Sequence, residues 1–229
     1  RASTDASLAD ITGAAMNYLY NTDKGFFMMV EGGKIDWACH ANDAMSTVKD
    51  VIAFDDAIAK AITFYNQHPT ETLIVVTGDH ETGGMALGFA NTPAADGYAL
   101  YLERMSGQTI SFQAFKDGPW KTFKANGGDI AALIQQYFGL KLSGASTDPM
   151  VLTSNELGML VKAYLKEVAN DASGRDTEEL YIDYGTYSPF IVTLTHILNR
   201  KAGIGWTSTS HSGDPLKTGA KGFGQELYT

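Results

Sequence analysis

The sequence predicts an α/β fold in which a partly parallel sheet is flanked by helices, with an α+β region inserted into it. Two observations lead to this prediction. A hydrophobic run at residues 26–30, a long helical pattern and a second hydrophobic run at 73–76 follow one another, as in a strand–helix–strand crossover. After residue 91 the composition becomes richer in Gly, Thr and aromatic residues, which indicates a separate region.

The first 91 residues carry the elements of the predicted core. Apolar residues recur at helical spacing over 7–21, which predicts an amphipathic helix. The run at 26–30 is apolar on both faces, as expected of a buried parallel strand. A second helical pattern extends over 44–66, and the apolar run at 73–76 is interpreted as the next buried strand.

The rest of the chain divides into an inserted region and a return segment. Residues 92–200 are predicted to form the inserted α+β region, and residues 201–229 to return to the core. Within the insertion, short alternating stretches at 92–125, such as T-I-S-F at 109–112, predict antiparallel hairpins.

Three helices are predicted in the second half of the insertion, at 128–138, 154–169 and 188–200. Ser154 is interpreted as the cap of the second of these helices, since a hydroxyl can accept from the first free N–H groups. Pro189 falls in the first turn of the third, where its missing N–H costs nothing.

Potential metal ligands follow both predicted core strands. Glu31, Asp36 and His40 come after the first strand, and Asp79 and His80 come after the second. Ligands bind at the carboxyl ends of strands in open α/β sheets, so both clusters are expected at one edge. Because carboxylates held close together repel one another, a bound cation would remove that cost. The donor types suit a pair of divalent metals.

The spacing within the first cluster carries further information. Asp36 and His40 are four residues apart, which places two ligands on one face of a helix. Glu31 offers a hard carboxylate oxygen, which suits magnesium better than zinc.

Each of these residues also has a simpler explanation when taken alone. Glu31 could be an exposed loop carboxylate, and Asp79 and His80 could be a helix cap and a surface imidazole. Cys39 is the only cysteine, which excludes an intrachain disulfide, and a buried small residue is preferred over a zinc thiolate there. His196, within an apolar run, is interpreted as structural.

Composition excludes some classes of function. A net charge of −9 argues against a nucleic acid as a specific partner, because a phosphate-backbone binder needs a basic stripe. No run approaches the ~20 apolar residues that a membrane span needs. The N-terminal residues have no signal-peptide character, so the protein is either cytosolic or its leader has been removed.

These motifs are similar to those of one known family. The stretch V-E-G-G-K-I-D-W-A-C-H at 30–40, followed by V-T-G-D-H at 76–80, resembles the alkaline phosphatase family in residue type, order and spacing. A later S-H-S-G segment at 210–213 matches the family's third motif. The resemblance implies three sets of metal ligands: Asp36, His40 and His211 for a first zinc, Asp79 and His80 for a second, and Glu31 for a magnesium.

The resemblance also implies a function. Alkaline phosphatases hydrolyse phosphate monoesters through a phosphoserine intermediate, with Zn²⁺ and Mg²⁺ as cofactors. Two cations about 4 Å apart can clamp the attacking and leaving oxygens of an in-line displacement. Family members are commonly homodimers and are usually periplasmic or secreted, so the same assembly and location are implied here.

The chain departs from the family pattern in one respect. The family's Asp-Ser-Ala nucleophile segment occurs nowhere in the sequence, and neither do the upstream residues that complete its metal and phosphate sites. The chain therefore resembles the C-terminal portion of an alkaline phosphatase. We expect the chain alone to be inactive, to keep the first zinc site, and to expose apolar surface and a sheet edge.

Two other functions fit the same residues. The first is another two-metal hydrolase of the same superfamily, a phosphodiesterase or phosphonate hydrolase, although the Glu-Gly-Gly spacer favours the monoesterase. The second is a non-catalytic module in which bound metal serves stability. Restoring the missing upstream half distinguishes this module from the enzyme, since only the enzyme would recover activity.

Overall fold

The computed structural model describes residues 5–20, 24–88, 100–168 and 177–228, and the chain divides into two compact units. The first unit comprises Arg1–Asp36, Val48–Glu81 and Gly213–Thr229, and the second comprises Trp37–Thr47 and Thr82–Ser212. The division at residues 91 and 200 that composition indicated stays a prediction.

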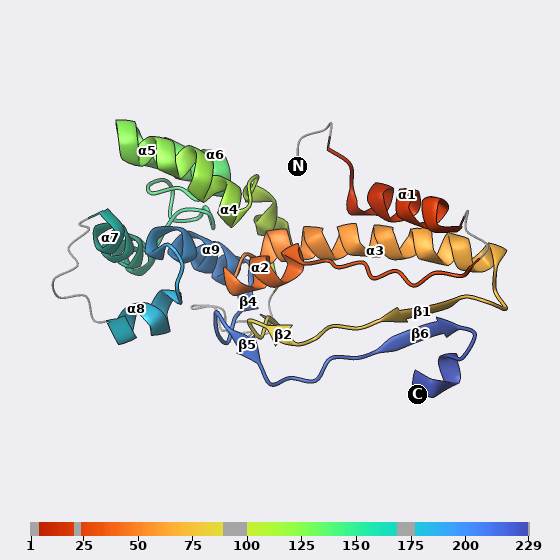
Figure 1. Ribbon diagram of the computed structural model, residues 1–229. Coiled ribbons are helices and arrows are strands. Elements are labelled where there is room, and N and C mark those ends of the chain that lie inside the picture. The colour runs from red at the N-terminus through yellow and green to blue at the C-terminus, as the bar shows by residue number, and fades with distance from the viewer. Residues whose placement is uncertain (1–4, 21–23, 89–99, 169–176, 229) are drawn as a thin grey trace. The chain divides into compact units, whose positions relative to one another are not determined.

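The first unit combines helices with a two-stranded ribbon (Figure 1). Its elements are α1 (Leu8–Tyr20), most of α3 (Ala44–Gln67), β1 (Leu73–Val76), β6 (Gly219–Gly222) and the short 3-10 helix η3 (Gln225–Tyr228). Both helices confirm the periodicity that predicted them. They contact each other through an aromatic pair, Tyr20 and Phe64, whose ring centroids are 5.4 Å apart.

The predicted buried strand at 26–30 is wrong. That segment belongs to no strand, and its Phe27 and Met29 are 92% and 71% exposed. The strand predicted at 73–76 exists as β1, but it pairs antiparallel with β6 and leaves Leu73 and Val75 exposed. An apolar run indicates a buried strand only where another layer covers it, and among the described residues no parallel neighbour flanks either segment.

The second unit is mainly helical. Its elements in chain order are α2 (Lys34–His40, which begins in the first unit), β2 (Glu81–Thr82, whose first residue belongs to the first unit), β3 (Ala86–Leu87), η1 (Leu102–Gly107), α4 (Phe112–Phe115), η2 (Lys116–Trp120), α5 (Lys121–Asn126), α6 (Ile130–Phe138), α7 (Ser154–Val168), α8 (Thr177–Tyr184), α9 (Pro189–Ala202), β4 (Ile204–Gly205) and β5 (His211–Ser212). Strand β2 pairs with β5, and β3 pairs antiparallel with β4.

The hairpins predicted at 92–125 are wrong where the structure describes that stretch, because residues 102–126 form consecutive short helices. Residues 92–99 lie outside the described residues. The T-I-S-F stretch, which predicted a strand, lies at the start of a helix, because the Ser111 hydroxyl accepts a hydrogen bond from the N–H of Ala114. Capping chemistry and the burial of Phe112 and Phe115 in a helical core override the alternating pattern.

The three helices predicted at 128–138, 154–169 and 188–200 are confirmed as α6, α7 and α9. The cap of α7 is corrected by one residue. Thr153 and Glu156 bond each other's backbone N–H groups, which is a capping box, so Ser154 is the first helical residue. Helix α8 was not expected.

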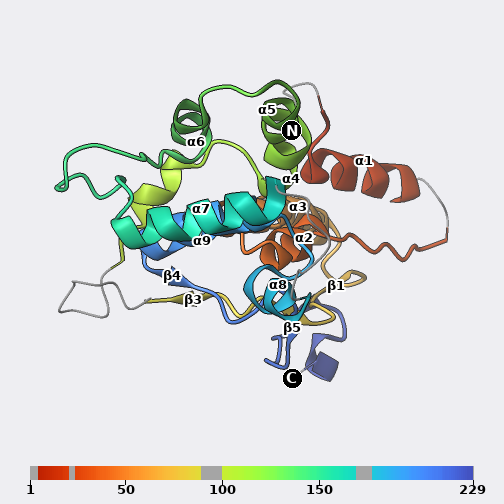
Figure 2. The same ribbon diagram turned by 90° about the vertical axis from the view of Figure 1, so that its left-hand side faces the viewer.

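Helix α9 is the centre of the second unit's core. It carries fully buried residues on most of its faces, and α7 lies along it in Figure 2. The Phe190 ring stacks on Trp120 with centroids 4.2 Å apart. The helix ends at Gly203, whose φ of 84° is left-handed and suits a residue without a Cβ.

A partly buried carboxylate joins three parts of this core. Glu167 at the end of α7 accepts hydrogen bonds from Ser188, from the Trp120 indole N–H at 2.7 Å and from the Phe190 N–H at 3.2 Å. Burial alone would raise the pKa of Glu167, but these hydrogen bonds together hold that pKa below its usual value.

In the part of the chain that the structure describes, no helix is long and apolar enough to cross a membrane.

Candidate metal centre

Helix α2 holds the first two predicted ligands of the centre. Asp36 and His40 lie one turn apart on this short helix, as the spacing predicted. The division between the two units falls after Asp36, but the helix runs through it. The position of Asp36 relative to His40 is therefore set by helix geometry.

The His40 ring is held by a backbone carbonyl. Its Nδ1 lies 2.7 Å from the carbonyl oxygen of Thr209. A carbonyl oxygen can only accept, so Nδ1 carries the proton in this hydrogen bond. In the neutral imidazole, Nε2 is then left with an unprotonated lone pair, which is the form that binds a metal.

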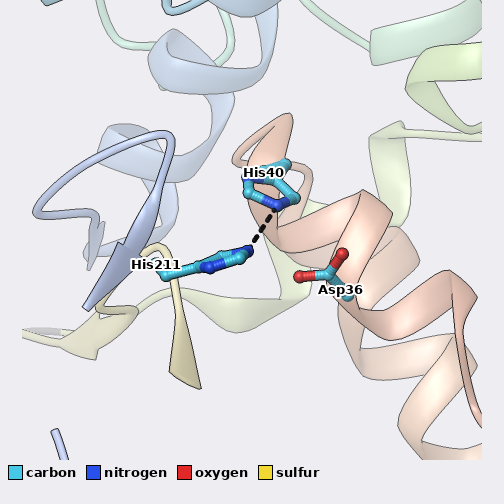
Figure 3. Close-up of side chains that lie close together, drawn as sticks. All are labelled: Asp36, His40 and His211. Atoms are coloured by element: carbon cyan, nitrogen blue, oxygen red, sulfur yellow. Dashed lines mark hydrogen bonds between the residues drawn. The ribbon is translucent and has the colours of Figure 1, made fainter. Parts of the chain in front are cut away.

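His211 on β5 is the third member of the group. Its Nε2 lies 3.2 Å from Nε2 of His40, and the two ring centroids are 5.0 Å apart. One potential ligand atom from each of Asp36, His40 and His211 lies within 4.8 Å of the others. Figure 3 shows the two imidazoles facing each other with the Asp36 carboxylate beside them.

These three residues form the one group of three or more potential ligands among the residues that the structure describes. Two of them, Asp36 and His40, are partly buried, and His211 is exposed. An imidazole pair and a carboxylate are donors that zinc accepts. The arrangement brings together residues separated by 171 positions in the chain.

The other predicted ligands lie in the first unit. Asp79 and His80 follow β1, and Oδ2 of Asp79 lies 3.2 Å from Nε2 of His80, so these adjacent side chains converge. The Asp79 carboxylate is 89% exposed. Glu31 is exposed as well, and a Cβ at Gly33 would lie only 3.0 Å from its Oε1.

Cys39 lies on the same helix as the two ligands. It is buried and, as the only cysteine, forms no intrachain disulfide, and its sulfur is 3.6 Å from the Thr47 hydroxyl. Its burial agrees with the preferred interpretation of a buried small residue.

Two residues of the centre were missed from the sequence. Thr209 contributes only its backbone carbonyl, and no side-chain pattern announces such a role. Asn42 lies two residues after His40, and its side chain bonds the backbone of both ligand-bearing segments. A polar residue directly after a ligand helix is a weak signal that could have drawn attention to Asn42.

The chain is similar to proteins of one known family. The profile of the alkaline phosphatase family matches residues 1–229. The chain is 30% identical to alkaline phosphatase 4 of Bacillus subtilis over 228 residues, covering 100% of this chain and 41% of that protein. It is 40% identical over 105 residues to the repressible alkaline phosphatase of Saccharomyces cerevisiae, covering 44% of this chain and 19% of that protein.

Two solved structures of alkaline phosphatases superpose on nearly the whole chain. A cold-active alkaline phosphatase from a psychrophilic Shewanella species superposes with a TM-score of 0.71 at 27% identity, covering 100% of this chain and 48% of that one. The alkaline phosphatase of Thermus thermophilus gives a TM-score of 0.69 at 23% identity, covering 97% of this chain and 43% of that one, and supports the fold alone. The predicted fold class, an incomplete α/β fold of this kind, is confirmed. The chain spans about two fifths of the length of the Bacillus protein.

Proposed function

Because this chain belongs to the alkaline phosphatase family, we propose that it supplies metal-binding residues to an enzyme that hydrolyses phosphate monoesters. The observation that carries the proposal is the convergence of Asp36, His40 and His211, from two distant segments, on one point. Their donor atoms are those that the family motifs assign to the first zinc.

The separation of the two imidazole nitrogens supports zinc at this point. Two nitrogen ligands at 2.0–2.1 Å from a tetrahedral zinc lie about 3.3 Å from each other. The observed Nε2–Nε2 distance is 3.2 Å. Since the Thr209 carbonyl fixes the proton on Nδ1 of His40, the Nε2 lone pair is directed toward His211 and is available to the cation.

The remaining motif residues would hold the other two cations. Asp79 and His80 are assigned to a second zinc, and their 3.2 Å approach lets one cation contact both side chains. Glu31 is assigned to magnesium because a hard carboxylate oxygen suits that ion.

The bound cations would supply Lewis-acid stabilisation to the phosphoryl oxygens and to the attacking and leaving oxygens. The residues of this chain position those charges. Asp36 would contribute a carboxylate oxygen to a bound zinc, and His40 and His211 would each contribute an imidazole nitrogen. Thr209 keeps His40 in the tautomer and orientation that binding requires.

The serine that attacks phosphorus in this family has no counterpart in the sequence, so the chain alone would be inactive. We assign the complete activity to a protein that also carries the nucleophile. We also propose that this protein forms a homodimer and is periplasmic or secreted, because zinc is available in those locations. Net charge does not oppose an anionic substrate, because bound cations would supply the local positive charge.

A chimera tests this function. The chain replaces the matching two fifths of alkaline phosphatase 4 of Bacillus subtilis, and hydrolysis of p-nitrophenyl phosphate is measured alongside cooperative melting. We expect hydrolysis in the chimera. His211→Ala should lower kcat/KM by about 100-fold or more, because a direct ligand matters more than the outer partners that supply 10–100-fold.

The control for this experiment is His68→Ala, which removes an imidazole that contacts Glu71 outside the proposed centre and should leave hydrolysis unchanged. A chimera that melts cooperatively and binds zinc but does not hydrolyse the ester would contradict the enzymatic function. That result would favour a module that uses metal only for stability. A preference for a phosphate diester over the monoester would favour the related phosphodiesterases.

A further inference from the structure

One side-chain amide connects the two segments that carry the imidazole pair. The Asn42 side chain is 2% exposed, and its Nδ2 donates to the carbonyl of Cys39 at 2.9 Å and to that of Ser208 at 2.8 Å. Cys39 directly precedes His40, and Ser208 directly precedes Thr209, whose carbonyl holds the His40 ring. The NH₂ group of Asn42 thus binds the residue before His40 and the residue before Thr209, and so holds both sides of the His40–Thr209 hydrogen bond.

The orientation of this amide follows from its partners. Because both carbonyls need donors, the NH₂ group must face them and Oδ1 must face the other way. Oδ1 lies 2.8 Å from Nε2 of His196, so His196 carries its proton on Nε2 and donates. The Asn42 carbonyl also accepts from the Asn199 side chain at 2.7 Å, so α9 anchors Asn42 at two points.

The backbone of Asn42 shows that this arrangement is maintained against a local cost. Its φ is 49°, and among the described residues it is the one non-glycine residue with a left-handed backbone. Asn adopts this region more readily than most residues, but glycine adopts it more easily. Glycine would be sufficient if this position only had to form a turn. The left-handed backbone therefore does not explain why an asparagine side chain is present here.

We propose that Asn42, oriented by His196, is a positioning residue that holds His40 with its Nδ1 proton on Thr209 and its Nε2 lone pair toward His211. The value of this position for metal binding rests on the proposed function. The positioning itself is a property of the chain's own hydrogen bonds and can be measured without metal. Neither Asn42 nor His196 contacts the proposed cation.

A competing explanation is that the backbone alone holds the segment. Gly83 accepts from the N–H groups of Thr207 and Ser208 at 2.9 and 3.2 Å and donates to the carbonyl of Ser210 at 2.9 Å. These bonds would survive any change of the Asn42 side chain. Replacing that side chain therefore separates the two explanations.

The test is an NMR measurement of histidine tautomers in the 229-residue chain, stripped of metal with a chelator. Long-range ¹H–¹⁵N correlation spectra are recorded at about pH 8.5, where imidazoles are ordinarily neutral. His40 should show a single tautomer, with the proton on Nδ1. Asn42→Gly keeps the left-handed turn accessible and removes only the amide, and the single-tautomer pattern of His40 should be lost.

Asn126→Gly, at the exposed end of α5, is the control for a generic Asn-to-Gly change and should leave His40 unchanged. Zinc affinity, measured in parallel, should fall by about 10–100-fold in Asn42→Gly, as for other residues that orient a ligand. A single Nδ1–H tautomer in folded Asn42→Gly would overturn the proposal in favour of the Gly83 backbone bonds. If the tautomer shifts but the unmodified chain binds no zinc, the positioning role stands and the proposed metal function fails.

A second pair of variants keeps the proposal testable if Asn42→Gly does not fold. His196→Gln retains an N–H donor for Oδ1 of Asn42, and His196→Leu removes it. We expect His40 to keep its single tautomer in the Gln variant and to lose it in the Leu variant. An unchanged tautomer in both would overturn the role of this pair.

Discussion

At the scale of single residues, hydrogen-bond partners decide which ring nitrogen carries a proton in His40 and in His196. Thr209 assigns the Nδ1 proton to His40, and Asn42 assigns the Nε2 proton to His196. The two rings use their nitrogens in opposite ways. His40 keeps Nε2 available for a cation, whereas His196 uses Nε2 to hold Asn42.

His196 makes the stability of the second unit dependent on pH. Burial, and next the nearby charge of Arg200, lower the pKa of His196 from its ordinary 6.5 to about 4. The folded chain then binds fewer protons at this ring than the unfolded chain between those values. Stability should therefore fall as the pH drops from about 6.5 to about 4, by about 3 kcal/mol from this group.

Tryptophan fluorescence during denaturation measures this effect, because Trp37, Trp120 and Trp206 all lie in the second unit. The comparison is between the unmodified chain and His196→Gln, which cannot titrate in this range. We expect a shallower loss of stability on acidification in the variant. Equal pH dependence in both chains would mean that His196 is not held neutral by burial.

At the scale of elements, α9 determines the stability of the second unit. Leu194 is fully buried in its middle, so Leu194→Ala should lower the free energy of unfolding by about 2–5 kcal/mol. Leu165→Ala on α7 is the matched control, since Leu165 is 57% exposed and its truncation should change stability by less than about 0.5 kcal/mol. Urea denaturation followed by tryptophan fluorescence gives both values. Similar losses in the two variants would contradict the central position of α9.

The elements also show what could be predicted from the sequence. Helical periodicity and local spacing predicted α1, α3, α7 and the ligand-bearing face of α2, because these depend on residues close in the chain. The strand at 26–30 failed because its apolar residues need a covering layer that the described residues do not form. The Thr209 carbonyl could not be predicted, since any residue type offers the same backbone oxygen.

At the scale of the whole molecule, the described residues of the first unit expose several large apolar side chains. The expectation of exposed apolar surface is confirmed for the described residues of this unit. Those at least 45% exposed on α1, α3 and the segment between them include Ile11, Tyr18, Phe27, Met29, Val48, Val51 and Ile52. A net charge of −9 favours solubility in spite of this surface.

Dye binding measures that exposed surface. The fluorescence of 8-anilinonaphthalene-1-sulfonate should rise in the presence of the folded chain, because the dye binds accessible apolar surface. The double variant Phe27→Ser, Met29→Ser should reduce the rise, and Lys24→Ser should not. An unchanged signal in the double variant would show that this segment is covered in solution.

The most direct test of the account is the zinc content of the chain after dialysis against trace zinc. Elemental analysis compares the unmodified chain with His211→Ala, Asp36→Ala and the control His68→Ala. We predict about one firmly bound zinc per chain, retained in the control and lost in the other two variants, since all three ligands of the first site are present. Zinc that persists in His211→Ala, or no zinc in the unmodified chain, would contradict the proposed centre.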